Sequence, residues 1–314
     1  MKKFLSSIVV IVAIMSAVLL TSCEYTRDNG DEWKSKFDIS NPNLDNAGTS
    51  QDTANSEGWY VTLEENFDGD KLPETFAPSP HGLRHTEYWC DDMVSVENGN
   101  AVIKATYSDN HECDICPKNG YFTSGIETKR TANGKSENLF EQAFGYFEAR
   151  VCFPKSGGMW SAFWLQTDSV GNIGNKGEDG SEIDIYESSF YNTNKSNIGH
   201  AIHYDGYANK HKCMDRISNS GYDLYDGFHT FAVKWTPYEY VFFVDGKVSW
   251  ATDFGGVCKV PAYLRFTNEI RDGKSGPYGQ ELGKFDGGEF LIDYVKVYQN
   301  VNYIPHIQSP SDFK

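Results

Sequence analysis

Positive charge is scarce in this sequence, because 28 Lys and Arg stand against 44 Asp and Glu, for a formal net charge of −16 at pH 7. A chain this acidic is repelled by phosphate backbones and by anionic lipid headgroups. The charge balance therefore argues against nucleic acid and against an anionic membrane surface as partners. Aromatic residues are abundant, at 15% of the chain, and their flat faces stack on sugar rings as well as filling a core.

Helical periodicity is also missing, since no long stretch after the N-terminus repeats apolar residues every three to four positions. Short stretches instead alternate apolar and polar residues between turn signals such as Asn98-Gly99 and Asp245-Gly246. We therefore expect an all-β domain, either a β-sandwich or a jelly roll. The expected strands are residues 59–67, 94–97, 101–107, 121–128, 145–153, 159–166, 180–189, 199–204, 228–235, 240–244, 247–250, 262–267 and 289–299.

A phosphate-binding loop is lacking as well. The Gly-rich segment Gly171-Asn172-Ile173-Gly174-Asn175-Lys176-Gly177 has no Gly-Lys-Ser/Thr ending, and no helical pattern follows it. We interpret this segment as a loop on the rim of a cleft.

Long apolar runs are confined to the N-terminus. Lys2 and Lys3 precede an apolar stretch over residues 4–20, and Leu20-Thr21-Ser22-Cys23 follows it. This order resembles a bacterial lipoprotein signal, which implies that residues 1–22 are removed and that Cys23 becomes the lipidated N-terminus. We therefore expect a membrane anchor through the lipid on Cys23 and a place in the cell envelope, at the outer membrane, facing the cell surface or the periplasm.

The rest of the chain divides into three parts. Residues 23–56 are rich in Asp, Asn, Ser, Thr and Gly and have few apolar residues, which predicts a flexible tether. Residues 57–300 contain no shift in composition and no linker, so we expect one domain, and a monomer. Residues 301–314 form a C-terminal tail.

Cysteines beyond Cys23 number six, which an exported chain can use for disulfides whose pairing the sequence leaves open. Cys113-Asp114-Ile115-Cys116, with His111 just before it, also has the ligand types of a zinc site. Because no second paired set of ligands is present, we favour a disulfide-stapled loop over zinc. The other cysteines are Cys90, Cys152, Cys213 and Cys258.

Three carboxylates lie within six residues in Glu182-Ile183-Asp184-Ile185-Tyr186-Glu187. Alternation predicts a half-buried strand with Glu182 and Asp184 on one face. Glu187 has the wrong parity, and a β-bulge after Asp184 would bring it onto the same face. Clustered carboxylates raise one another's pKa, so one of them can stay protonated near neutral pH. One ionised and one protonated carboxyl can break a glycosidic bond, although a Ca²⁺ site or an exposed acidic edge would use the same residues.

Aromatic and histidine side chains lie on neighbouring expected strands. Trp160 and Trp164 share one face of the strand just before the acidic one, where a sugar ring could stack on them. On the strand after the acids, His203 faces the cleft if Ile202 faces the core. A structural role in the core or in a hydrogen bond remains open for each of them.

At this point the sequence resembles glycoside hydrolase family 16. The stretch 182–187 matches the bulged Glu-x-Asp-x-x-Glu signature of that family. Further segments are similar to family segments and follow in family order. They are Thr123–Ile126, Phe144–Arg150, Trp160–Leu165, His229–Pro237, Val244–Gly246 and Ile292–Tyr298.

The resemblance implies a jelly roll of two antiparallel sheets with an open concave cleft, and endo-acting, retaining hydrolysis of a polysaccharide. Glu182 would be the nucleophile, Glu187 the acid/base, and Asp184 would lie between them. No cofactor would be required for the chemistry. A structural Ca²⁺ on the convex face is implied, with Asp293 as its side-chain ligand and a backbone oxygen near Gly99.

Departures from the family pattern leave the substrate open. Laminarinase-like members usually have Pro where this chain has Ser161, and they usually have an Asn-rich strand where this chain has residues 263–270. Glu269 and Arg265 of that strand could reach the mouth of the cleft. These departures argue against a β-1,3-linked glucan alone, so a β-1,3-linked or mixed-linkage glucan, a β-galactan and host-glycan galactosides are all retained as candidate substrates. A non-catalytic, glycan-binding surface lipoprotein on the same fold is the alternative function.

Overall fold

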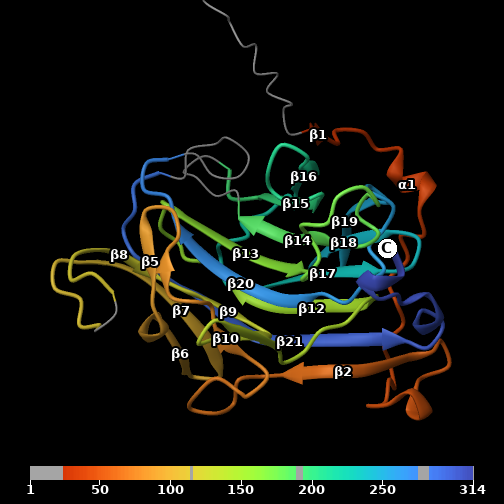
Figure 1. Ribbon diagram of the computed structural model, residues 1–314, viewed down its shortest axis with the longest axis horizontal. Helices are drawn as coiled ribbons and strands as arrows, with labels where there is room; N and C mark the ends of the chain where they lie inside the picture. The colour runs from red at the N-terminus through yellow and green to blue at the C-terminus, as the bar shows by residue number, and fades with distance from the viewer. Residues whose placement is uncertain (1–23, 114–115, 189–193, 275–282, 314) are drawn as a thin grey trace, which may run out of the picture.

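The computed structural model describes residues 24–113, 116–188, 194–274 and 283–313 as two β-sheets that lie one over the other (Figure 1). In spatial order, the eight-stranded sheet consists of β1 (Glu24–Arg27), β16 (Lys212–Asn219), β15 (Asn197–Tyr204), β14 (Ser181–Ser188), β13 (Met159–Gln166), β20 (Tyr263–Ile270), β9 (Gly125–Glu127) and β3 (Ala77–Pro78). The prediction of an all-β domain is confirmed.

The second sheet covers the first over much of its area. Its strands are, in spatial order, β19 (Lys247–Thr252), β18 (Tyr240–Val244), β17 (His229–Trp235), β12 (Gly145–Cys152), β21 (Gly288–Asn300), β7 (Asn100–Ser108), β8 (Gly120–Thr123), β5 (Glu87–Trp89) and β4 (Gly82–Leu83), with β2 (Trp59–Glu65) beside β21 and β6 (Val94–Glu97) beside β7. The strands β10 (Lys129–Ala132) and β11 (Lys135–Asn138) form a separate hairpin. The pairings are antiparallel except β1 with β16 and β5 with β8.

The main core fills the space between the sheets. Tyr186 of β14 packs its ring against Phe231 of β17 at 4.5 Å and against Phe153 at 5.0 Å between centroids. Ile183 and Leu165 are also fully buried in this cluster. Because successive side chains of a strand point to opposite faces, the neighbours of these residues point away from the core.

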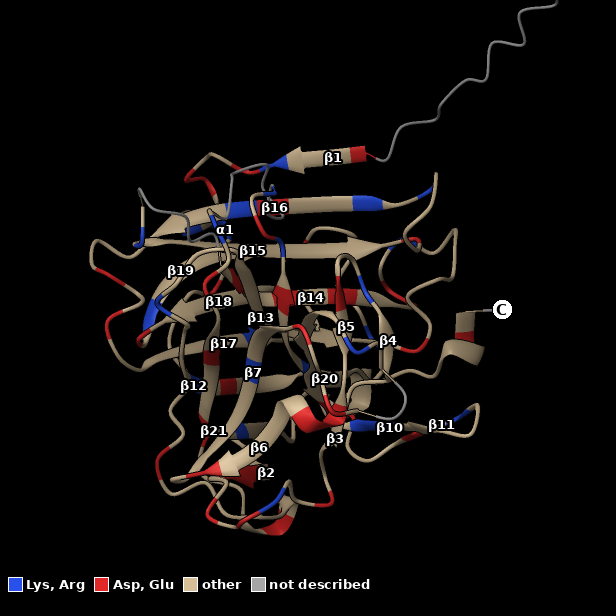
Figure 2. Ribbon diagram, turned by 90° about the vertical axis from the view of Figure 1, so that its left-hand side faces the viewer, with Lys and Arg blue, Asp and Glu red and all other residues tan. Residues whose placement is uncertain are grey.

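The N-terminal segment differs from the expected tether. The strand β1 pairs with the edge strand β16, as Figure 2 shows, and α1 (Trp33–Lys36) follows it. Trp33 is buried in the main core, and Trp250 donates a 2.8 Å hydrogen bond to Asp28. The segment is poor in apolar residues, but one Trp and the free backbone groups of an edge strand suffice to hold it.

The C-terminal tail also packs on the domain. It contains two short 3₁₀ helices, Ile304–His306 and Pro310–Phe313. Two further 3₁₀ helices lie earlier in the chain, at Gln51–Thr53 and Asp91–Met93. Tyr303 meets Trp59 edge to face at 5.6 Å. Within the described ranges, no helix is long and apolar enough to cross a membrane. The predicted signal at residues 1–22 and the lipidated Cys23 lie outside those ranges.

Candidate active site

The strand β14 contains the bulge that its parity predicts. Against β15, Asp184 pairs with Ala201 and Glu187 pairs with Gly199, so two residues on β14 oppose one on β15. Against β13, the register shifts at Ile185. A bulge of this kind re-aims a side chain without breaking the sheet. As a result Glu182, Asp184 and Glu187 all line one cavity of about 320 Å³.

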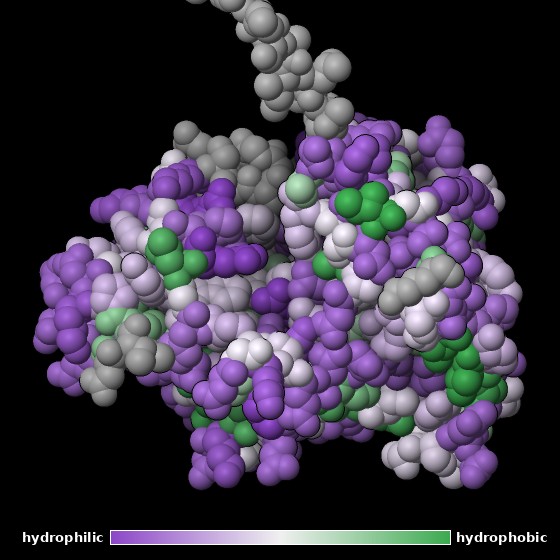
Figure 3. All heavy atoms as spheres, in the orientation of Figure 1, coloured by the Kyte–Doolittle hydropathy of each residue, from purple (hydrophilic) through white to green (hydrophobic). Residues whose placement is uncertain are grey.

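The cavity opens on the face of the eight-stranded sheet that points away from the core. Acidic positions fall in the middle of β14 in Figure 2, and Figure 3 shows the surface hollowed near the middle of the molecule, among hydrophilic residues. Asp184 and Glu187 are buried, and Glu182 is half-buried. These carboxylates are therefore largely shielded from bulk water at the base of a surface hollow.

Like charges at close quarters shift the protonation of this cluster. Burial, and then the charge of Asp184, raise the pKa of Glu182 to about 7. His203 of β15 opposes this, since its Nε2 lies 3.1 Å from the Asp184 carboxylate and 4.0 Å from that of Glu182. Burial alone would lower the pKa of His203, but its contact with Asp184 raises that pKa well above the usual value. The two nearby carboxylates therefore favour the protonated, cationic form of His203.

Two further side chains hold Glu182 from the other side. The Tyr207 hydroxyl donates to Oε2 of Glu182, and Nε2 of Gln166 lies 3.3 Å from the same oxygen. Gln166 also donates a 2.5 Å hydrogen bond to the Tyr207 hydroxyl. This arrangement holds Oε2 of Glu182 against Tyr207 and Gln166, while Oε1 lies 4.0 Å from Nε2 of His203. Neither Tyr207 nor Gln166 was predicted, since no sequence pattern marks a loop tyrosine as a neighbour of β14.

Both predicted tryptophans line the cavity, on the same face of β13. Trp164 is buried and its Nε1 donates to the Thr267 hydroxyl at 3.2 Å. Arg265 lies over the Trp164 ring, 4.1 Å from its centroid. Trp160 is more exposed and stacks in parallel with the ring of His85 at 6.5 Å. The Arg265 guanidinium therefore covers a face of Trp164, and the Arg271 guanidinium lies over the ring of Trp160, 5.6 Å from its centroid.

Glu269 lies opposite Trp160 in the pairing of β20 with β13 and also lines the cavity. It is buried, with Arg84 Nε at 2.9 Å from one oxygen and His85 Nε2 at 2.8 Å from the other. Burial would raise the pKa of Glu269, but the contacts from His85 and Arg84 hold it below the usual value. Arg84 and His85 escaped prediction, because they lie some 185 residues from Glu269 in a segment without a distinctive pattern.

The residues expected to bind Ca²⁺ belong to the second sheet, with Asp293 in β21. The carboxylate of Asp293 is paired with the guanidinium of Arg150. Gly99 is in the β6–β7 turn, with φ of +72°. Since a guanidinium already provides the positive charge at Asp293, this carboxylate does not fit Ca²⁺ in this arrangement, and no step of the chemistry is assigned to that ion.

The profile of "Glycosyl hydrolases family 16" matches residues 85–253. The endo-1,3-1,4-beta-glycanase ExsH of Rhizobium meliloti is 29% identical over 208 residues, which cover 65% of this chain and 39% of that protein. The beta-glucanase of Rhodothermus marinus is 24% identical over 77% of this chain and 85% of its own. This chain spans less than half of the length of several curated relatives, since three of them are matched over only 39%, 34% and 30% of their own lengths.

Solved structures share the fold. The catalytic domain of an endo-1,3-beta-glucanase (laminarinase) of Thermotoga petrophila aligns with a TM-score of 0.60 at 22% identity, over 78% of this chain and all of that one. A structure reported under "Prominent members of the human gut microbiota express endo-acting O-glycanases to initiate mucin breakdown" aligns with a TM-score of 0.61 at 19% identity, over 80% of this chain and 94% of that one. The jelly roll is thereby confirmed. Because the profile match spans more than half of the sequence and includes the acidic strand β14, this chain belongs to the glycosyl hydrolases of family 16.

Proposed function

We propose that the protein is an endo-acting, retaining β-glycoside hydrolase that cleaves an extracellular polysaccharide. The observation that carries this proposal is the bulge in β14, which gathers Glu182, Asp184 and Glu187 in one open cavity beside Trp160. A cleft open at its sides accepts the interior of a polymer. Both glutamates are present in the cavity, which favours an enzyme over a protein that only binds glycans.

In the first step, Glu182 attacks the anomeric carbon while Glu187 protonates the departing glycosidic oxygen, so a glycosyl–enzyme ester forms and one sugar chain leaves. In the second step, Glu187 takes a proton from water, the water oxygen attacks the anomeric carbon, and Glu182 departs as a carboxylate. Two inversions leave the configuration of the sugar unchanged.

The surroundings of Glu182 match the demands of this cycle. A nucleophile must be ionised, and the cationic His203 together with the hydroxyl of Tyr207 stabilises the charged carboxylate. Asp184 lies between the two glutamates along β14 and is tied to His203, so it can hold that cation in place. A pKa of about 7 for Glu182 predicts an acidic limb of the rate near neutral pH.

For the substrate, we propose a β-1,3-linked or mixed-linkage glucan, or a β-galactan. The glucan is supported by the names of the curated relatives, which include endo-1,3-1,4-beta-glycanases and beta-glucanases. Ser161, which replaces the usual Pro, is buried and donates a 2.9 Å hydrogen bond to Asn268, so it does not line the cavity. The residues that distinguish this cleft are instead those around Glu269.

We also propose that the protein is a monomeric cell-envelope lipoprotein, anchored by a lipid on Cys23. The lipoprotein signal in the sequence supports this placement. Because β1 starts at Glu24 and pairs with β16, such an anchor would lie close to the eight-stranded sheet rather than at the end of a long tether. Metabolic labelling with a fatty acid, in the parent and in Cys23→Ala, tests the anchor separately from activity.

The test of the activity is a panel of laminarin, lichenan, β-1,3-galactan, agarose and mucin glycans, with products separated by size and their anomeric configuration followed by ¹H NMR. We expect oligosaccharides from one of these polymers with the β-configuration at the first time point. Release of monosaccharide alone would contradict the endo mode. Initial appearance of the α-anomer would contradict the retaining mechanism.

A further inference from the structure

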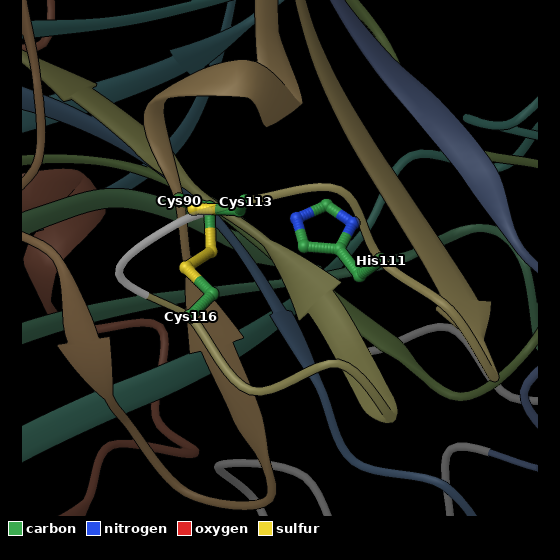
Figure 4. A group of neighbouring side chains, drawn as sticks. All are labelled: Cys90, His111, Cys113 and Cys116. Carbon is green, nitrogen blue, oxygen red and sulfur yellow. A yellow bond between two sulfur atoms is a disulfide. The ribbon is translucent and has the colours of Figure 1, made fainter.

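A cluster of sulfur and nitrogen ligands lies outside the active site, at the end of the second sheet that carries β5 and β8. The ligand atoms of Cys90, His111, Cys113 and Cys116 all lie within 4.8 Å of one another. Figure 4 shows the three cysteines gathered beside the imidazole of His111. Cys90 and Cys116 form a disulfide here, whereas Cys113 forms none. The sequence pattern missed Cys90 as a member, because it precedes His111 by 21 positions.

A disulfide accounts for only two of these four residues. His111 is buried, its ring stacks on Phe122 at 3.8 Å, and its Nε2 makes no hydrogen bond. That nitrogen lies 3.2 Å from a carboxylate oxygen of Asp92. Burial of an imidazole next to a third thiol has no purpose in a simple Cys90–Cys116 staple, but it completes a set of four ligands.

We propose that, with its cysteines reduced, the protein binds one Zn²⁺ through Cys90, His111, Cys113 and Cys116. Three thiolates and one imidazole form a closed tetrahedral set of the kind used in structural zinc sites. In such a site the ligand atoms are about 3.7 Å apart, given Zn–S bonds of about 2.3 Å. Opening the disulfide and drawing in atoms that already lie within 4.8 Å is therefore a local change.

The surroundings favour a cation. Asp92 places a carboxylate oxygen 3.2 Å from Nε2 of His111, which adds negative charge beside the four ligand residues. Cys90 packs in a small apolar cluster with Met93 and Phe122, separate from the main core, which limits access of water. Both features strengthen binding of a divalent ion.

The chemistry balances without a reductant, because the newly made chain carries thiols. Zn²⁺ displaces three thiol protons as it binds, and the imidazole binds in its neutral form. The disulfide is the alternative product of the same cysteines, formed when an exogenous disulfide oxidant removes two electrons and two protons from Cys90 and Cys116. Zinc binding and disulfide formation are therefore mutually exclusive at this site.

This site bears on the cleft through β5. Cys90 directly follows β5, and Arg84 donates a 3.0 Å backbone hydrogen bond to Glu87 of that strand. Arg84 and His85 in turn hold Glu269 at the cavity. The zinc ion would therefore fix the wall of the cleft that carries these two residues.

The test uses the full mature chain purified under a phosphine reductant that does not bind metal, with zinc measured per chain after dialysis. Cys113→Ser and His111→Gln are the diagnostic variants, because both keep the Cys90–Cys116 pair and can fold in the oxidised state. Cys152→Ser removes a free cysteine outside the cluster and is the matched control. Substitution by Co²⁺ gives a visible spectrum that reports tetrahedral thiolate ligands.

We expect one zinc per chain in the reduced parent and in Cys152→Ser, and an affinity lower by roughly 100-fold or more in Cys113→Ser and His111→Gln. Two results would overturn the proposal. One is a folded, reduced parent that holds no zinc. The other is zinc that stays bound with equal affinity in both diagnostic variants, which would place the metal elsewhere.

Discussion

Two carboxylates line the same cleft in opposite electrostatic settings. Glu182 of β14 stands beside Asp184, and its pKa is raised to about 7. Glu269 of β20 is more deeply buried, yet Arg84 and His85 hold its pKa below the usual value. Burial raises the pKa of both carboxyl groups. The residues that contact them, and not the depth of burial, therefore decide which pKa is high and which is low.

The different settings of Glu182 and Glu269 indicate different roles for the two carboxylates. A carboxylate that can change its protonation and its bonding at neutral pH suits a reacting group. A carboxylate held by a guanidinium and an imidazole keeps its charge and fixes those partners in place. The proposed function places bond breaking on the β14 side of the cleft, and we expect the β20 side to arrange the sugar.

The largest expected effect comes from the β14 side. Glu182→Gln keeps the volume and loses the nucleophile, so we expect kcat on the cleaved polysaccharide to fall on the order of 10³-fold or more. The loss is measured by reducing-end release, with circular dichroism as the control for folding. A variant that cleaves as fast as the parent would show that Glu182 is not the nucleophile.

Azide distinguishes the two glutamates further. In Glu182→Ala, azide can enter the space of the lost carboxylate and attack the anomeric carbon directly, which gives a glycosyl azide of inverted configuration. The same product with retained configuration would contradict the assignment of Glu182.

The second prediction concerns Glu187→Ala. We expect polysaccharide cleavage to fall roughly 10²–10⁴-fold, because the leaving sugar is no longer protonated. An aryl glycoside whose leaving group needs no proton should lose far less in the first step, and azide should give a product of retained configuration. Equal losses on the polymer and on the aryl glycoside would rule out an acid role for Glu187.

The β14 side could be predicted from sequence because its signals are local. The parity of Glu187 required a bulge, and the register contains one after Asp184. The alternation in β13 likewise placed Trp160 and Trp164 on one face, and both line the cavity. These features depend on residues that are neighbours along a strand.

The β20 side could not be predicted in the same way, because its partners come from distant segments. Arg84 and His85 meet Glu269 across some 185 positions, in a stretch that carries no periodic pattern. The packing of the N-terminal segment could not be predicted for a related reason. β1 pairs with the edge of β16, and that edge exists only once the domain has folded. The composition of a segment does not indicate whether the folded domain offers an edge strand with which the segment can pair.

The third prediction tests the β20 side. Glu269→Gln leaves Arg84 and His85 without their charged partner, so these groups should shift in the cleft. Their displacement should weaken substrate binding, so we expect KM to rise roughly 10-fold while kcat changes little. Glu178→Gln is the matched control, because Glu178 is also paired, with Lys259 at 2.6 Å, but does not line the cavity. A fall in kcat as large as that of Glu182→Gln would abolish the distinction between the two sides.

The smallest effect is expected for His203→Gln and appears only in the pH profile. The charge of His203 favours ionised Glu182, so its loss should raise the pKa of Glu182 above the present value of about 7. The rate requires ionised Glu182 and is lost as pH falls through that pKa, so the acidic limb of kcat/KM should move to higher pH. A shift of one unit lowers the rate about 10-fold on the acidic side and leaves the plateau unchanged.

His211→Gln is the control for this prediction. Burial lowers the pKa of His211 to about 4, so this ring is uncharged near neutral pH although it contacts His203 at 2.8 Å. Removing it should leave the limb in place, and equal shifts in both variants would mean that the hydrogen bond, not the charge, sets the protonation of Glu182.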